Sequence, residues 1–272
     1  MLHAIVWLIR YAIRSCKYAL RLIGDSHRYL AFRYSHFRGV YETFEQAVAA
    51  APGSKKTGYN HKELAQVYLA ELNFDLSSFD HPILSHLGRI LGERDVILDF
   101  GGNIGTHYLQ YRKYMNLEEV QWIVCDVSEI IKVGMEKCRG ISNIAFVNDV
   151  AAVKTPGVDI FLASGSMQYI ASPNLLLPKL IEKDLRPKHI LINRVPLYDG
   201  QHFVTLQNGG PVCYPQHVFN RERFIRGIAG LGYELIDFWD DNVDSCIIPF
   251  HPERSVRVYK GLYFCDISVA RR

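Results

Sequence analysis

The chain has 272 residues, 49% of them hydrophobic and 22% charged, so it can bury a full core and lacks the composition of a disordered chain. Its six cysteines are scattered without a Cys-x-x-Cys pair, which argues against a zinc site or a disulfide framework and fits a reducing cytosol. Residues 1–40 carry seven basic side chains and one acidic one, whereas the rest hold 24 basic and 27 acidic side chains, so the main body is not a general nucleic-acid binder.

Residues 1–24 are the first predicted element, a basic amphipathic helix. Four basic side chains share one helical face at spacings of four, three and four residues: Arg10, Arg14, Lys17 and Arg21. This pattern is typical of a helix that lies in a membrane interface. The apolar run of residues 4–9 is too short to span a bilayer, and no charged segment precedes it as in a secretory signal. The alternative is a helix that packs on its own domain or on the second subunit of a homodimer.

Residues 25–92 form a predicted helical preface that precedes the first clear strand and serves as a lid. Thr43 and Gln46 have the spacing of a capping box and open a short helix. The sequence APGSKKTGYN is a loop by its Pro, Gly and Ser content, and Asn60 and Glu63 bracket the start of a second helix. A third helix ends near Gly92.

From residue 93 to 272 apolar strands alternate with helices, which predicts an α/β fold. The expected architecture is a Rossmann-like, seven-stranded, mostly parallel sheet with helices on both faces. The strands are predicted at Val96–Phe100, Gln121–Cys125, Ile144–Val147, Asp159–Ala163, His189–Asn193, residues 232–239 and residues 259–267.

The predicted helices of this domain have recognisable starts. They cover Asn103–Met115, Ser128–Cys138 with Ser128 as N-cap, Ser172–Asp184 with Ser172 as N-cap and Pro173 at the first helical position, and Asn220–Ala229. Residues 194–220 between the fifth strand and the last of these helices are predicted to be a long functional loop. The acidic run of residues 237–244 is predicted to be a solvated turn.

The turn after the first strand, DFGGNIG, limits the choice of cofactor. A nicotinamide enzyme would have G-x-G-x-x-G, but Asn103 and Thr106 occupy the second and third glycine positions, and no G-K-[ST] follows as in a P-loop. The pattern that is present is Asp99, Gly101 and Gly105. In this pattern the acid can organise the turn and contact a cationic amino-acid ligand, while the glycines let a ligand approach the backbone.

On these residues the chain resembles the class I S-adenosylmethionine-dependent methyltransferases. VILDFGGNIGTHY is similar to their first motif, and VDIFLASGSMQYI to the motif of their fourth strand. The resemblance implies that Asp126 takes the ribose hydroxyls and that Asp149 contacts the adenine amino group. The residues that it implies for S-adenosylmethionine are Asp99, Gly101, Gly102, Asn103, Gly105, Asp126, Asp149 and Ser164.

A longer set of motifs, including LINRVPL, YPQHVFNRERF and YKGLYF, resembles a bacterial family of predicted methyltransferases often associated with surface-polysaccharide loci. The likeness runs from about residue 37 to residue 264. It implies a methyltransferase fold and suggests glycan chemistry.

The long loop supplies the candidates for a general base. His202 is the first choice because histidine titrates near neutral pH, and His217 and Asp199 are alternatives. Each of the three is also readily explained as an ordinary loop-stabilising side chain. No acid and histidine cluster has metal-ligand spacing, so no metal is expected.

Three further residues are assigned to the acceptor side. Arg194 ends the fifth strand, where it would bind an anionic group such as a phosphate or uronate, or else pair with Asp199 or a neighbouring acid. Tyr169 and Tyr198 are placed in the acceptor pocket, with core packing as the alternative for Tyr169. Tyr59, in the preface, is expected to reach over the cofactor.

The leading hypothesis is a methyltransferase that acts on a sugar hydroxyl of a cell-surface glycan or its lipid-linked precursor. It would work in the cytoplasm, attached to the inner face of the membrane through residues 1–24. The alternatives are a non-catalytic methyltransferase-like scaffold at the membrane and a nicotinamide-dependent sugar-modifying enzyme, which the glycine spacing disfavours.

Peripheral attachment is tested by vesicle sedimentation. The full chain should bind anionic vesicles more tightly than a chain lacking residues 1–24, because the basic face is attracted to anionic headgroups. Equal binding by the two chains would contradict the hypothesis.

Overall fold

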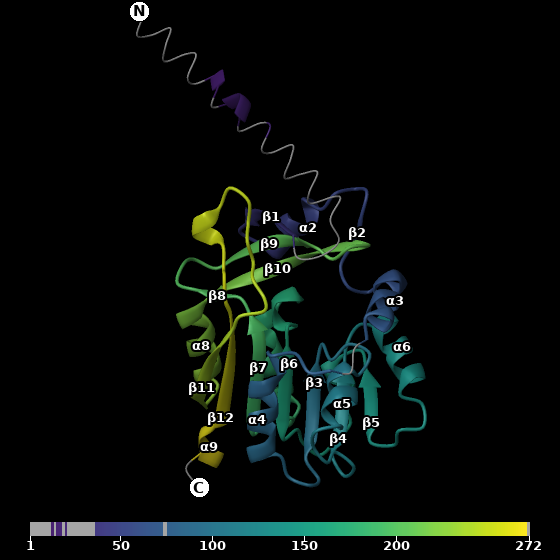
Figure 1. Ribbon diagram of the computed structural model, residues 1–272. Helices are drawn as coiled ribbons and strands as arrows, with labels where there is room; N and C mark the ends of the chain where they lie inside the picture. Colours follow the sequence, from purple (N-terminus) through teal and green to yellow (C-terminus); the bar gives the residue numbers. More distant parts are fainter. Residues whose placement is uncertain (1–11, 14, 18–19, 21–35, 73–74, 271–272) are drawn as a thin grey trace, which may run out of the picture.

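The computed structural model describes residues 12–13, 15–17, 20, 36–72 and 75–270 (Figure 1). Most of the predicted amphipathic segment, residues 1–24, therefore lies outside the described residues. Within the described part of the chain, no helix is long and apolar enough to cross a membrane. All six cysteines are free thiols.

The main sheet has seven strands in the order β11-β12-β7-β6-β3-β4-β5. The five strands from β7 to β5 run parallel, and β12 pairs antiparallel with both β7 and β11. The strand order reverses between β3 and β6. From β3 the chain continues through β4 to β5 on one side, and it then crosses over to β6 on the other side of β3. The strands are β3 (Val96–Phe100), β4 (Gln121–Cys125), β5 (Ile144–Val147), β6 (Ile160–Ser164), β7 (His189–Val195), β11 (Tyr233–Asp241) and β12 (Tyr259–Asp266).

Helices cover both faces of this sheet, and successive strand residues separate into two cores. Leu98 packs with α7 (Leu176–Glu182) and α8 (Arg221–Ala229), whereas its neighbour Ile97 packs with α4 (Asp80–Ile90) and α5 (Thr106–Tyr111). This division follows from the period of two in a strand, and it explains why both residues are apolar. The predicted doubly covered sheet is confirmed.

A second sheet, which was not predicted, lies across the carboxyl ends of the parallel strands (Figure 1). Its order is β1-β9-β10-β2, with β8 paired to β10. The prediction of one long loop over residues 194–220 was wrong, since most of this segment is a hairpin of β9 and β10. The strands are β1 (His36–Tyr41), β2 (Lys56–Thr57), β8 (Leu197–Tyr198), β9 (Phe203–Asn208) and β10 (Val212–Asn220).

The preface contributes two strands to this second sheet, so the prediction of a purely helical preface was wrong. β1 pairs antiparallel with β9, and β2 pairs with β10. The capping box is present at α2 (Phe44–Ala49), where the Thr43 hydroxyl accepts from the Gln46 N–H at 3.2 Å. In α3 (Lys62–Ala70) the N-cap is His61, while the Asn60 side chain instead accepts from the Glu129 N–H at 2.9 Å. That contact ties the preface to α6 (Ser128–Lys137).

Two other helix starts differ from the sequence prediction. Helix α5 begins at Thr106 because the glycine turn extends to Gly105, and α6 is capped at Val127 without a side-chain bond from Ser128. The start at Ser172 is confirmed, although Pro173 opens a 3₁₀ turn (Pro173–Leu175) that leads into α7. Further short helices cover Val150–Ala152, Met167–Tyr169, Pro252–Arg254 and, as α9, Ile267–Ala270.

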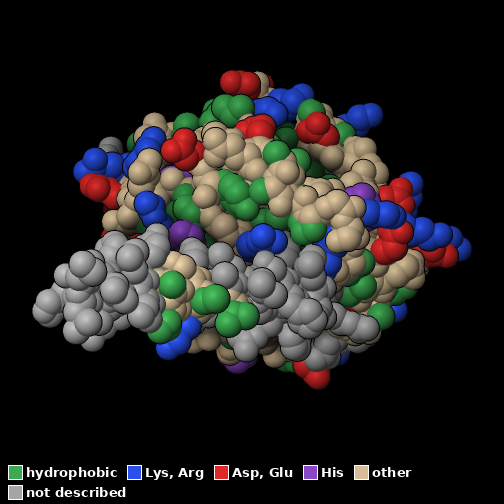
Figure 2. All heavy atoms as spheres, turned by 90° about the horizontal axis from the view of Figure 1, so that it is seen from above, with side chains coloured by type: hydrophobic (Ala, Val, Ile, Leu, Met, Phe, Trp, Pro, Cys, Tyr) green, Lys and Arg blue, Asp and Glu red, His purple; other side chains and the backbone are tan. Residues whose placement is uncertain are grey.

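On the face seen from the side of the second sheet, acidic and basic side chains are interspersed along the part of the margin that the described residues form (Figure 2). No single basic patch dominates the visible surface of the described residues in this view.

Candidate active site

The glycine turn between β3 and α5 has three residues in the left-handed region. Gly101, Asn103 and Gly105 have φ angles of +70°, +59° and +88°. Asparagine tolerates this conformation better than most side chains, which explains why it replaces a glycine here. A Cβ on Gly101 would lie 2.2 Å from the Ser166 Cβ, so the turn packs directly against the segment after β6.

A cavity of about 1160 Å³ lies between the carboxyl ends of the main sheet and the second sheet. Pockets for one small molecule measure roughly 300–1000 Å³, so this cavity can hold a cofactor together with a second molecule. Its walls include the glycine turn, the ends of β4, β6 and β7, α3 with its N-cap residue, and four strands of the second sheet, β1, β2, β9 and β10.

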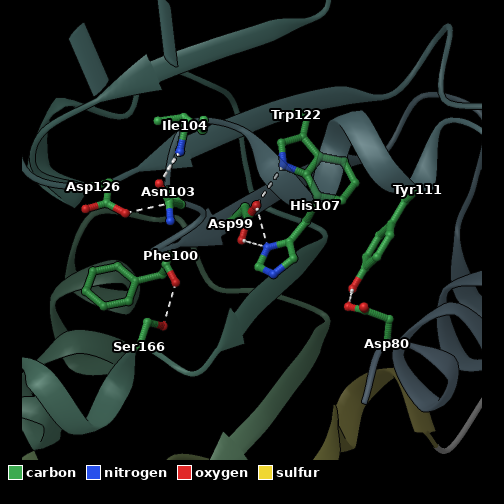
Figure 3. Close-up of polar contacts among 10 residues, drawn as sticks. All are labelled: Asp80, Asp99, Phe100, Asn103, Ile104, His107, Tyr111, Trp122, Asp126 and Ser166. Carbon is green, nitrogen blue, oxygen red and sulfur yellow. Dashed lines mark hydrogen bonds and ion pairs between the residues drawn. The ribbon is translucent and has the colours of Figure 1, made fainter. Parts of the chain in front are cut away.

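Asp126, directly after β4, links the glycine turn to the neighbouring strand. Its carboxylate accepts from the Asn103 N–H at 2.9 Å and from the Val127 N–H at 2.7 Å (Figure 3). Burial raises the pKa of Asp126 to about 6, against the opposing effect of these two donors. The carboxylate lines the cavity and is ionised at neutral pH.

Two more of the predicted cofactor residues line the same part of the cavity. Asp149 caps a 3₁₀ turn by accepting from the Ala151 N–H at 2.8 Å. Ser164 ends β6, is 6% exposed, and its Oγ has no hydrogen-bond partner among the described residues. A buried hydroxyl of this kind is satisfied when a ligand bonds to it.

Contrary to the prediction, Asp99 does not lie in the cavity wall. Its fully buried carboxylate accepts from the His107 Nδ1–H at 3.0 Å and from the Trp122 Nε1–H at 3.1 Å (Figure 3). A Cβ on Gly102 would lie 2.3 Å from the Asp99 Oδ2, so this glycine makes room for the carboxylate. Asp99 therefore organises the turn, and His107 stands between it and the cavity.

Aromatic rings from three distant segments line the opposite side of the cavity. Tyr59 stacks on Tyr214 with ring centroids 4.1 Å apart, and Tyr169 lies 5.1 Å from Tyr59. The Tyr169 hydroxyl donates to the Gln207 Oε1 at 2.8 Å. Tyr59 and Tyr169 therefore both line the cavity.

Arg194, at the end of β7, is neutralised by a residue that the sequence reading overlooked. Its Nε donates to the Asp244 Oδ2 at 2.6 Å, and its guanidinium lies 4.1 Å from the centre of the Phe79 ring. Its backbone has a φ of +56°, an uncommon conformation for arginine. The structure thus matches the expected pairing with a neighbouring acid, and that acid is not Asp199. Arg194 and Asp244 both line the cavity.

The acidic run is consequently not a solvated turn. Asp241 is 2% exposed, and burial together with the nearby Asp244 raises its pKa. No local signal marked Asp244 as a cavity residue, because its partner Arg194 lies 50 positions earlier in the chain.

The three predicted general bases lie outside the cavity wall. His217 donates from Nε2 to the Ile170 carbonyl at 3.1 Å, so its Nδ1 accepts from the His202 Nε2–H at 3.0 Å. Burial lowers the pKa of His217 to about 4 and also lowers that of His202. Asp199 is exposed and pairs with Arg221 at 2.6 Å. The prediction of a histidine base from this segment is therefore not supported by the geometry.

Tyr198 is likewise outside the wall. Its hydroxyl donates to the Gln201 carbonyl and accepts from the Arg254 Nη1 at 2.8 Å, so it secures the segment before β9. Gln168, at the end of the segment after β6, had no role assigned from the sequence, and it lines the cavity at 2% exposure. Its Nε2 donates to the Arg194 carbonyl at 3.1 Å, and its Oε1 has no partner among the described residues.

No protein-family model and no curated protein sequence matches the chain. Among solved structures it is similar to the 1,6-didemethyltoxoflavin-N1-methyltransferase of Burkholderia thailandensis, solved with 1,6-didemethyltoxoflavin and S-adenosylhomocysteine. The identity is 15%, the TM-score is 0.51, and the match covers 77% of this chain and 91% of that one. The chain has a Rossmann-like methyltransferase fold.

Two other matches have lower TM-scores. An S-adenosylmethionine-dependent methyltransferase of Clostridium acetobutylicum matches at 12% identity and a TM-score of 0.49, over 75% of this chain and 98% of that one. A methyltransferase of Aquifex aeolicus matches at 18% identity and a TM-score of 0.48, over 76% of this chain and 96% of that one.

The importance of the Arg194–Asp244 pair is tested by the variant Asp244→Asn. It should lower the free energy of unfolding by about 1–2 kcal/mol, because a partly buried guanidinium loses its charged acceptor. Urea denaturation measures this change. The matched variant Asp199→Asn, which breaks an exposed ion pair, should stay within about 0.5 kcal/mol of the wild type. Equal effects of the two variants would contradict the account.

Proposed function

We propose that the protein is an S-adenosylmethionine-dependent methyltransferase. The observation that carries the proposal is the juxtaposition of Asp126 with the glycine turn at one end of a cavity large enough for two molecules. An ionised carboxylate after the second parallel strand can accept hydrogen bonds from the two hydroxyls of a ribose. The Burkholderia methyltransferase, solved with S-adenosylhomocysteine, supports the same choice of cofactor through the shared fold.

The residues present fit this cofactor better than a dinucleotide. Asp126 would hold the ribose, Asp149 and its neighbours the adenine, and the unpartnered Ser164 hydroxyl the amino-acid end. The backbone N–H of Asn103 already donates to Asp126, so the turn offers fewer free donors for a pyrophosphate. When bound, the cofactor supplies a methyl group on a positively charged sulfur. The protein must then hold the acceptor atom close to it and in line.

The acceptor half of the cavity suits a sugar hydroxyl. Tyr59, Tyr169 and Tyr214 offer flat apolar faces, while Gln168 offers an unpartnered carbonyl oxygen that requires a donor. A sugar ring presents apolar faces and a rim of hydroxyl donors, which is the complementary arrangement. Because Asp244 already compensates the charge of Arg194, a neutral acceptor fits this half better than a phosphate or uronate.

Asp244 replaces the three earlier candidates for the proton acceptor. It is the carboxylate that lines the acceptor half of the cavity, and Arg194 fixes its orientation through one oxygen. In the proposed step the acceptor oxygen would take the methyl group as the sulfur–methyl bond breaks, which leaves a neutral thioether, and the hydroxyl proton would pass to the Asp244 carboxylate. The buried Asp241 stands behind this carboxylate.

We further propose that the acceptor belongs to a cell-surface glycan or its lipid-linked precursor at the inner face of the membrane. The basic amphipathic pattern of residues 1–24 and the resemblance to proteins of surface-polysaccharide loci support this setting.

Calorimetric titration with S-adenosylhomocysteine and NAD tests the cofactor. The wild type should bind the first and not the second. The variant Asp126→Ala should weaken binding by roughly 10- to 100-fold, because it removes the acceptors for two ribose hydroxyls. Asp240→Ala, which breaks an exposed ion pair, is the matched control and should bind normally. If neither ligand binds the wild type, the non-catalytic scaffold is favoured. If Asp126→Ala binds S-adenosylhomocysteine as tightly as the wild type, the proposed position of the cofactor is wrong.

The pKa of Asp126 predicts how binding depends on acidity. Affinity for S-adenosylhomocysteine should fall as the pH drops through about 6, because the protonated carboxyl accepts hydrogen bonds less well. Titrations between pH 5 and pH 7 measure this dependence. The loss should disappear in Asp126→Asn, whose amide does not titrate, and a persistent loss in that variant would assign the effect to another group.

A further inference from the structure

His107 is a buried side chain in the wall of the cavity that can carry a positive charge. It occupies the second position of α5, two residues after Gly105. Its Nδ1–H donates to the Asp99 carboxylate, with distances of 3.0 and 3.1 Å to the two oxygens (Figure 3). Trp122 holds the same carboxylate from the other side, so the ring has a fixed orientation.

Because Nδ1–H is bound to Asp99, Nε2 is the ring nitrogen that can contact a ligand in the cavity. The residue is 8% exposed and belongs to the cavity lining, and no described residue bonds to its Nε2. Figure 3 shows His107 and Asp126 on opposite sides of the glycine turn. A cofactor with its ribose on Asp126 and its far end towards Ser164 would therefore pass beside His107.

The charges around His107 favour its protonated form. Burial alone lowers the pKa of His107, but the charge and hydrogen bond of Asp99 oppose this effect, and the pKa is raised above its ordinary value. Asp80, on α4, acts in the same direction, whereas Arg194, on β7, acts against it. The Tyr111 ring also faces the imidazole, and the hydroxyl of that ring donates to Asp80 at 2.7 Å.

We propose that His107 binds the α-carboxylate of the cofactor's amino-acid end through Nε2–H, and that Asp99 is the residue that positions it. This inference rests on the proposed function. Asp99 was expected to contact a cationic ligand group directly. In this proposal it acts through His107, whose Nε2–H donates to an anionic group of the ligand. In the competing arrangement a neutral His107 would accept from the ligand's ammonium group.

A ligand pair separates these two arrangements. S-adenosylhomocysteine carries both groups, whereas 5′-(3-aminopropylthio)-5′-deoxyadenosine lacks only the carboxylate. In the wild type, loss of the carboxylate should weaken binding by roughly 10- to 100-fold, as expected for a charge-assisted hydrogen bond. In His107→Asn the same change of ligand should cost less than about threefold, because the side-chain amide reaches Asp99 but offers nothing to the cavity.

Two further variants show whether an effect belongs to the cavity-facing nitrogen. His107→Gln places an amide donor nearer to the former Nε2 and should restore part of the preference for the carboxylate. His251→Gln changes an exposed histidine and should behave as the wild type. Thermal denaturation of each variant shows that the fold is retained.

Proton exchange gives an independent measurement on the unmodified protein. Titrations at pH 8 in two buffers of different ionisation enthalpy should show proton uptake when S-adenosylhomocysteine binds, because an anion at Nε2 favours the imidazolium. At this pH Asp126 is already ionised and contributes nothing. Proton release, or an equal penalty for the missing carboxylate in the wild type and His107→Asn, would overturn the inference and leave the proposed function standing. Failure of both ligands to bind the wild type would instead overturn the proposed function.

Discussion

The buried carboxylate of Asp99 is the constraint on which the candidate site depends. A fully buried charge is costly unless donors surround it, and here the indole of Trp122 and the imidazole of His107 supply them. The carboxylate also occupies the space that a side chain at position 102 would need. The glycine turn, the start of α5 and the orientation of His107 therefore follow from one residue at the end of β3. This explains why an acid occupies the fourth position of a strand whose other four residues are apolar.

The second sheet gives the site its other wall. It joins β1 and β2 of the preface to a hairpin inserted between β7 and α8, and it lies over the carboxyl ends of the parallel strands (Figure 1). In this position Tyr59 from the preface meets Tyr214 from the hairpin and Tyr169 from the segment after β6. Long-range pairing thus closes a cavity that the Rossmann-like sheet alone would leave open.

The strands of the main sheet could be predicted because each is a short apolar run bounded by turn residues, and three had the predicted ends. The hairpin was missed for a physical reason. Strand β10 contains Pro215 and several polar residues, and a proline argues against a strand. It is nevertheless paired with β9, and β9 is paired on its other side with β1, which lies more than 160 positions earlier in the sequence. The residues of the site divide in the same way, into those with a local sequence signal and those that only tertiary contacts bring into place. Asp126 and Asp149 follow strands and were expected because the motifs there resemble those of the methyltransferases, whereas Asp244 was missed because only tertiary contact brings it to Arg194. The pairing of Asp99 with His107 lies within eight residues and had a local signal, a histidine in the first turn of the helix.

A crystal structure with S-adenosylhomocysteine bound is the most direct test of the central claim, that one cavity holds the cofactor across the glycine turn. The account predicts ribose hydroxyls within hydrogen-bond distance of Asp126, the carboxylate on the Nε2 of His107, and the sulfur facing the half of the cavity that contains Asp244. A ligand in another part of the molecule, or one in the reverse direction with its adenine beside His107, would contradict it.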